Sequence, residues 1–273
     1  MLGVVCHGYS FGVRSPWSFT TSSVPIVATS IHAGHDLRPA VASRTALDDA
    51  TRFREEDPFT DYLTSVGGST VVAHRSRFEV DLNRPRDAAV YRTPEDAWHL
   101  DLWREALSAE EIEQSRDLYD DFYAEFGRRL DTLADRGPFV VLDLHSYNHR
   151  RDGADLPAAP DAMNPEVNVG TGALDRRRWG GLLDRFVESL AAEKARGRRL
   201  DVREDVRFRG GELCRWVNRR YEERGCALAI EFKKVFMDEW TGEPDENHLE
   251  ELRGALAAVV PALLERLRCP APT

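Results

Sequence analysis

Three strongly apolar segments constrain the fold more than any other feature of the sequence. Residues 24–31, 139–144 and 226–232 consist mostly of aliphatic and aromatic side chains. Continuous apolar strands of this length are typical of a parallel sheet that is covered on both faces, because neither side of such a strand meets water. The sequence therefore predicts three central strands in a mostly parallel sheet.

Amphipathic segments separate these strands. One begins at Ser108, where Glu111 completes a capping box, and its apolar residues then recur at helical spacing. Residues 175–196 and 245–268 show the same spacing, and we expect Pro261 to kink the second of them. Strands that alternate with helices predict an α/β fold, with a mixed, mostly parallel sheet and helices on both faces.

The segments between these elements are less regular. Residues 70–82 alternate in polarity and predict one or two strands, and residues 200–208 predict another strand. Residues 48–65 are expected to form a loop with a short helix, and residues 168–171 a turn. The long irregular connection over residues 83–102 is of a kind that often wraps a functional site.

Length and composition favour one domain. A single domain over residues 24–273 accounts for most of the 273 residues, and residues 1–23 are expected to form an N-terminal extension. That extension lacks the charged and apolar regions of a signal peptide. No run approaches the roughly 20 apolar residues that span a bilayer, so we expect no membrane partner.

Charge and cysteine content disfavour other classes of protein. Lys and Arg total 37 against 47 Asp and Glu, a net charge of −10, whereas nucleic-acid-binding surfaces are usually basic. The four cysteines form no Cys-x-x-Cys pair, which argues against a cysteine-bound metal or a redox motif. Their scarcity fits a reducing compartment, so we expect a cytoplasmic protein. The sequence does not indicate an oligomeric state.

Ionisable residues stand where the three apolar strands end. His32 follows the first strand, His145 follows the second, and Glu231 lies at the end of the third. Because the carboxyl ends of parallel strands meet at one edge of a sheet, these side chains are expected to converge. Two imidazoles and a carboxylate form a natural zinc site, although such ligands also bind other divalent metals. His35 could contribute, but without a helix its spacing from His32 is a weak signal.

Two further features predict function. A carboxylate within an apolar strand, as at Glu231, is costly to bury unless it is paired or functional. Arg75, Arg77 and Arg84 lie close together in an acidic chain and could bind a carboxylate, or could form a salt-bridged strand edge instead. The two glycines after Arg209 would let the backbone approach a ligand closely.

Seven short motifs occur in the order in which they occur in one known family. They are HAGH at His32, EEDPFTD over residues 55–61, SRFEVDLNRP over 76–85, LDLHSY over 142–147, NVGT over 168–171, RFRGG over 207–211 and AIEFKKVFMDE over 229–239. The sequence thus resembles the N-formylglutamate amidohydrolase family, whose fold is related to the zinc carboxypeptidases and aspartoacylases. The resemblance implies a zinc-carboxypeptidase-like fold and hydrolysis of the amide bond of a small anionic N-acyl amino acid.

The resemblance also implies a role for individual metal-binding and catalytic residues. His32 and His145 match the two metal-binding histidines of the family, which holds one zinc ion. The acidic ligand should come from residues 55–61, where Asp57 is favoured and Asp61 is the second choice. Glu231 matches the catalytic glutamate of the carboxypeptidase type.

The expected substrate contacts follow from the same comparison. Asn83 and Arg84 resemble the Asn-Arg pair that holds a substrate carboxylate, and Arg77 and Arg209 could be further contacts for an anion.

The sequence departs from the family pattern where substrate identity would be set. Ile31 and Ala33 replace the Pro and Ser that usually surround the first histidine, and Glu212 follows the glycine pair. Residues 147–151 are also distinctive. These departures leave open a related zinc amidase or carboxypeptidase that acts on another acyl-amino acid or a short peptide, and a non-catalytic anion-binding relative.

Overall fold

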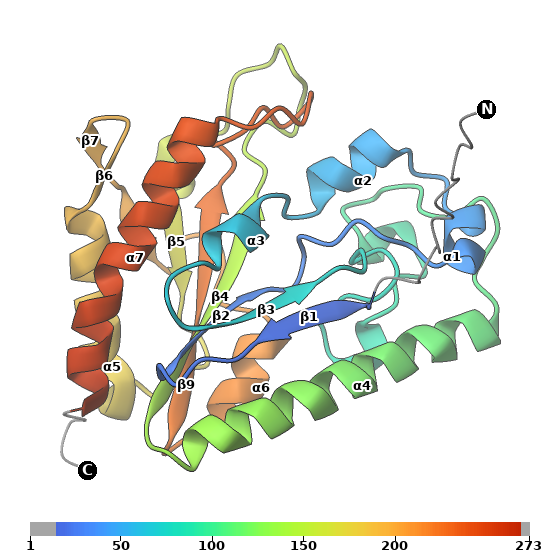
Figure 1. Ribbon diagram of the computed structural model, residues 1–273. Coiled ribbons are helices and arrows are strands. Elements are labelled where there is room, and N and C mark those ends of the chain that lie inside the picture. Colours follow the sequence, from blue (N-terminus) through green and yellow to red (C-terminus); the bar gives the residue numbers. More distant parts are fainter. Residues whose placement is uncertain (1–14, 269–273) are drawn as a thin grey trace, which may run out of the picture.

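A seven-stranded mixed sheet forms the centre of the molecule (Figure 1). The computed structural model describes residues 15–268. Four of the six strand pairings are parallel, and the two antiparallel pairings involve β1 with β3 and β5 with β9. In spatial order the strands are β1 (Trp17–Thr20), β3 (Ser69–Ala73), β2 (Ile26–Ser30), β4 (Phe139–Tyr147), β9 (Gly225–Lys233), β5 (Val167–Gly170) and β8 (Val202–Glu204).

Helices cover both faces of this sheet. The helices are α1 (Pro39–Arg44), α2 (Asp49–Glu55), α3 (Thr60–Leu63), α4 (Ala109–Ala134), α5 (Arg176–Ala192), α6 (Glu212–Arg220) and α7 (Glu246–Arg268). Short 3-10 helices span Arg86–Ala88, Pro94–Asp96 and Asp161–Met163, and a small hairpin pairs β6 (Lys194–Ala195) with β7 (Arg198–Arg199). Apolar side chains of α3, α5 and α7 pack on one face of the sheet, and those of α4 and α6 pack on the other.

The central strands are buried because each of them contributes to both cores. In β4, Val140, Leu142 and Leu144 face the α5 and α7 side, whereas Phe139 and Val141 face the α4 and α6 side. This two-sided burial is the physical reason for the continuous apolar runs in the sequence. The predicted fold class, an α/β fold with a mostly parallel sheet and helices on both faces, is confirmed.

Several predicted elements differ from the structure. Of residues 70–82, only residues 70–73 lie in a strand, which is β3 (Ser69–Ala73). The chain then turns back through residues 76–84. The turn predicted over residues 168–171 is largely the strand β5, which lies between β9 and β8. Within β5, the side chain of Asn168 closes onto a neighbouring loop, since its amide donates to the carbonyl of Phe208 and accepts from the N–H of Arg207.

Several elements were not predicted, among them β1 and α6. Residues 17–20, expected to belong to an extension over residues 1–23, form the edge strand β1. Trp17 of β1 packs edge-on against Phe122 of α4, with ring centroids 5.6 Å apart, which ties this segment to the domain. The rest of the predicted extension, residues 1–14, lies outside the described residues. Helix α6 was also missed, because charged residues dominate its exposed side.

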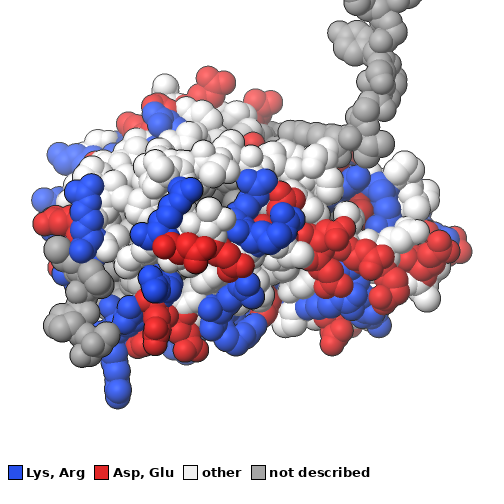
Figure 2. Space-filling model, turned by 60° about the horizontal axis from the view of Figure 1, so that its bottom comes forward, with Lys and Arg blue, Asp and Glu red and all other residues white. Residues whose placement is uncertain are grey.

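The surface carries charges of both signs. On the face shown in Figure 2, Lys and Arg side chains alternate with Asp and Glu side chains and form no large patch of one sign. Within the described residues, no helix is long and apolar enough to cross a membrane.

Candidate metal centre and active site

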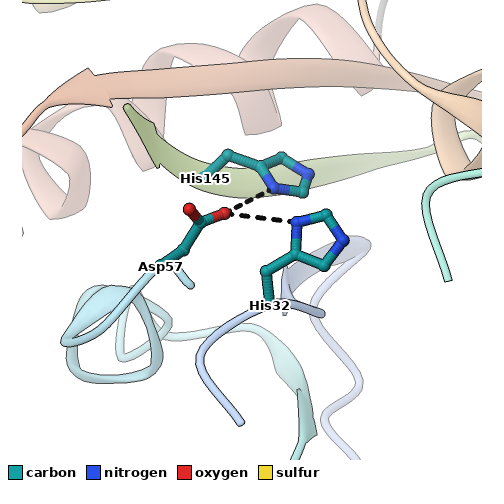
Figure 3. Close-up of side chains that lie close together, drawn as sticks. All are labelled: His32, Asp57 and His145. Atoms are coloured by element: carbon teal, nitrogen blue, oxygen red, sulfur yellow. Dashed lines mark hydrogen bonds and ion pairs between the residues drawn. The ribbon is translucent and has the colours of Figure 1, made fainter. Parts of the chain in front are cut away.

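Three distant segments bring His32, Asp57 and His145 together at the carboxyl edge of the sheet (Figure 3). His32 follows β2, His145 lies in β4, and Asp57 lies in the turn between α2 and α3. Oδ2 of Asp57 is 3.3 Å from Nδ1 of His32 and 3.0 Å from Nδ1 of His145. The structure therefore places one carboxylate between the facing nitrogens of two buried imidazoles.

The donor set fits a divalent metal. Nδ1 of His32 is buried and has no hydrogen-bond partner of acceptable geometry among the described residues. One ligand atom from each of the three residues lies within 4.8 Å of the others. Two imidazole nitrogens and a carboxylate oxygen, with a position left for water, are the ligands typical of catalytic zinc.

Two outer carboxylates orient the imidazoles. Nε2 of His32 lies 2.7 Å from Oδ1 of Asp81, and Nε2 of His145 lies 3.0 Å from Oδ2 of Asp143. With a metal bound, a proton on each Nε2 would leave each Nδ1 lone pair free to meet the ion beside Asp57. Such carboxylate–histidine pairs fix the tautomer and the ring orientation of metal ligands.

The carboxylate of Asp81 is itself held by a buried network. Arg77 donates to Oδ2 at 3.0 Å, Tyr91 donates to the same oxygen, and the backbone N–H of Asn83 donates to Oδ1 at 2.8 Å. These contacts, with the Arg77 guanidinium as the largest favourable charge, outweigh burial and keep the pKa of Asp81 well below its ordinary value. The carboxylate that faces His32 is therefore ionised and fixed.

Burial and charge oppose each other at the central groups. Burial alone would raise the pKa of Asp57, but a hydrogen bond with His145 and the nearby imidazole of His32 hold that pKa far below its ordinary value. Burial would lower the pKa of His145, but Asp143 and Asp57 raise it well above the ordinary value. Asp143 and Asp57 therefore favour the protonated form of the His145 imidazole between them.

Glu231 lies beside this group because of strand register. His145 of β4 and Glu231 of β9 are direct neighbours on adjacent parallel strands. Burial, reinforced by the nearby Asp57 and Asp143, raises the pKa of Glu231 to about 7, although His145 acts in the opposite direction. A carboxylate with a pKa near neutrality can accept a proton and return it, as a general base requires.

A cavity of about 220 Å³ opens onto these residues. Its walls come from the ends of β2, β4 and β9, the α2–α3 turn, and loops around residues 98, 151 and 209. The lining residues are His32, Glu55, Asp57, Arg77, Asn83, Trp98, His145, Ser146, Tyr147, Asn148, Arg151, Phe208, Arg209, Gly210, Gly211, Glu231 and Lys234.

The structure brings most of the predicted site residues to this cavity. Arg77, Asn83 and Arg209 line it, as does Glu231. The side chain of Asn83 reaches His145, with Nδ2 at 3.3 Å from Nε2. The glycine pair was predicted to let the backbone approach a ligand, and at Gly211 the backbone approaches a side chain of the protein: a Cβ there would lie 2.1 Å from Oδ1 of Asn83.

Three predicted or considered residues do not join the site. Asp61 is exposed in the first turn of α3 and is not a member of the metal-compatible group, so Asp57 is the carboxylate there. His35 instead contacts Oε2 of Glu56 through Nδ1 at 2.5 Å. Arg84 does not line the cavity, because its guanidinium lies over the ring of Tyr91 and near Asp81.

Sequence reasoning missed other lining residues. Lys234 is one of two adjacent lysines after Glu231, and nothing in the pattern distinguishes them. Trp98 lies in the long irregular connection with a positive φ of 53°, and its ring lies 4.8 Å from the guanidinium of Arg77 and 5.3 Å from that of Arg151. The positive φ is what marks this tryptophan as unusual, and a backbone angle cannot be read from the sequence.

The fold and the site together define an α/β protein with a candidate metal centre at the carboxyl edge of its sheet. The family model described as FGase, N-formylglutamate amidohydrolase, matches residues 24–237, and the chain belongs to this family of hydrolases.

Individual relatives agree with this assignment. An N-formylglutamate deformylase of Pseudomonas aeruginosa is 27% identical over 267 residues, covering 92% of this chain and 95% of the relative. A second, from Pseudomonas putida, is 27% identical over 170 residues, covering 56% of this chain and 61% of the relative. The crystal structure of N-formylglutamate amidohydrolase from Ralstonia eutropha JMP134 has the same fold, with a TM-score of 0.73 and 19% identity over 93% of this chain and 98% of that one.

Proposed function

We propose that this protein is a metal-dependent amidohydrolase that releases the acyl group of an N-acyl amino acid, with N-formylglutamate as the first candidate substrate. The observation that carries the proposal is the buried His32, Asp57 and His145 group directly beside Glu231 in one cavity. The names of the family and of the P. aeruginosa relative support the choice of substrate.

The residues divide the reaction between them. His32, Asp57 and His145 would hold one zinc or similar divalent ion, which would lower the pKa of bound water and polarise the substrate carbonyl. Glu231 takes a proton from the attacking water and later delivers it to the nitrogen of the departing amino acid. Asp81 and Asp143 keep the two imidazoles oriented throughout, because each holds the far nitrogen of one ring.

The partners of each cation in the cavity wall indicate which one is free to bind the substrate carboxylate. Arg77 is matched by Asp81, and Arg151 donates to Glu55 at 2.7 Å. Lys234 is held by two backbone carbonyls. The guanidinium of Arg209 has no hydrogen bond or ion pair with any described residue, and it lines the cavity. Arg209 is therefore the cation with the most donors free to bind a carboxylate.

The test is a hydrolysis assay with matched variants. The zinc-loaded wild-type protein is expected to release formate from N-formyl-L-glutamate, and Glu231→Gln is expected to bind zinc but lose at least about 100-fold in kcat, the lower range for a lost general base. Arg209→Met should raise KM about tenfold or more, whereas Arg219→Met, which changes an exposed arginine paired with Glu212 away from the cavity, should not.

Three results would contradict the proposal. They are a wild-type protein that holds no divalent metal after purification without chelator, a Glu231→Gln variant with wild-type turnover, and no hydrolysis of formyl-, acetyl- or succinyl-amino acids. Hydrolysis of an acetyl or succinyl derivative in place of the formyl compound would retain the chemistry and reassign the substrate.

A further inference from the structure

Lys234 is a buried cation in the wall of the catalytic cavity. Its side chain is 1% exposed, and it lies one residue beyond the end of β9, three residues after Glu231. The backbone N–H of Lys234 donates to the carbonyl of Tyr147 at 3.0 Å, so this residue extends the pairing of β9 with β4. Its position relative to both catalytic strands is therefore fixed.

The ammonium group of Lys234 contacts backbone carbonyls and not carboxylates. Nζ donates to the carbonyl oxygens of Arg54 and Glu56, each at 2.6 Å. No described carboxylate lies within ion-pair distance of it. Burial lowers the pKa of this group to about 8, which reports the desolvation cost of the charge. Asp57, Glu55 and Glu239 offset part of this cost through their charges, but none of them contacts the ammonium group, whose direct partners are the two carbonyls.

The two carbonyls belong to the segment that carries the metal carboxylate. Arg54 and Glu56 flank Glu55, a wall residue of the cavity, and Glu56 immediately precedes Asp57. From the other side, the N–H of Asp57 donates to the carbonyl of His32 at 2.9 Å. Residues 54–57 are thus tied to the end of β9 through Lys234 and to the end of β2 through His32.

We propose that Lys234 is a positioning residue that holds the turn carrying Asp57 in register with the histidines and Glu231. The proposal rests on the proposed metal site at His32, Asp57 and His145. Metal binding tolerates only about 0.2 Å of error in ligand distances, so a turn that is free to shift lowers metal affinity before it affects the fold.

The adjacent lysine is a matched control. Lys233 is also buried, but its Nζ donates to Oδ1 of Asp161 at 2.8 Å and to the carbonyl of Asn164 at 3.0 Å. Lys233 does not line the cavity, and it does not contact residues 54–57. Both residues are therefore buried lysines, and they differ in the chain segment that their ammonium groups contact.

The experiment measures Zn²⁺ affinity of metal-free protein by competition with a chromophoric chelator, together with thermal unfolding of the same metal-free samples. Lys234→Met is expected to weaken Zn²⁺ binding at least about tenfold, as losses of outer contacts of metal ligands do. Lys233→Met is expected to stay within about twofold of the wild-type affinity even if its unfolding temperature falls.

The outcomes separate this inference from the proposed function. Wild-type Zn²⁺ affinity in Lys234→Met, or equal losses in both lysine variants, would overturn the positioning role. If Lys234→Met does not fold, the same titration is made on Lys234→Gln. A Zn²⁺ affinity of this variant equal to that of the wild type would also overturn the positioning role. If Asp57→Asn binds Zn²⁺ as the wild-type protein does, the metal site of the proposed function is wrong instead.

Discussion

Glu231, the proposed general base, would carry its function at a cost in stability. Its carboxylate is 9% exposed at the end of a strand that is otherwise apolar. Its pKa in the folded protein is raised from the ordinary 4.5 to about 7, mainly by burial. A raised pKa means that the folded state binds the proton more tightly than the unfolded state, so folding is favoured at low pH and this advantage is lost as the pH rises through 7.

A glutamine at this position should therefore stabilise the metal-free protein in alkaline solution. We expect Glu231→Gln to exceed the wild type by up to about 3 kcal/mol in free energy of unfolding at pH 8, from the 2.5-unit difference in pKa. At pH 5 the difference should fall to about 1 kcal/mol, because the folded carboxyl is then protonated while the unfolded carboxyl is already mostly ionised. Urea unfolding in the presence of a chelator at both pH values measures it, and a difference that does not depend on pH would contradict the assignment.

At the scale of elements, the turn after β4 gives the cavity its distinctive rim. The buried carboxylate of Glu239 accepts the backbone N–H groups of His149 and Arg150, at 2.7 and 3.1 Å. The indole N–H of Trp240 donates to the carbonyl of Arg150 at 3.0 Å. These contacts fix the turn so that the next residue, Arg151, reaches the cavity and Glu55.

Removing the charge of this rim should affect substrate binding more than turnover. Arg151 is 37% exposed, donates to Glu55 at 2.7 Å and has further donors free to meet an anionic substrate. We expect Arg151→Met to raise KM for N-formyl-L-glutamate about threefold, less than Arg209→Met because Arg151 is already paired with Glu55, while kcat changes less. Arg150→Met is the control, because the Arg150 side chain contacts the carbonyl of Ala154 and does not line the cavity. Equal KM values in the two variants would exclude this role for Arg151.

At the scale of the whole molecule, the candidate metal site joins parts of the chain that are otherwise separate. Its ligands come from the end of β2, from β4 and from the α2–α3 turn, so an ion would cross-link three segments. A ligand that binds only the folded state at 100 times its Kd stabilises that state by about 2.7 kcal/mol. For a chain of this size we therefore expect zinc to raise the unfolding temperature by about 5–10 °C.

Differential scanning calorimetry with and without chelator measures this shift. Asp57→Asn supplies the control, since it removes the charged ligand while it keeps the volume of the side chain. A zinc-induced shift that is the same in the variant and in the wild type would show that the ion binds elsewhere.

The sequence predicts the centre of this molecule better than its periphery. The apolar strands around His32, His145 and Glu231 are legible because burial on both faces leaves a continuous pattern. The choice of Asp57 over Asp61, and the roles of Asp81 and Lys234, depend on how irregular turns fold back onto strand ends. Such long-range contacts leave no periodic signal in the chain, so only the structure reveals them.

The placement of β9 has a consequence for how the protein emerges from the ribosome. This strand is the last of the sheet to be synthesised, yet it lies in the middle, between β4 and β5. Until residue 233 has been made, β4 and β5 have no strand to join them, and Glu231, the proposed base, is absent. We therefore expect the two parts of the sheet to join only after β9 has been synthesised, so that the cavity forms late in folding.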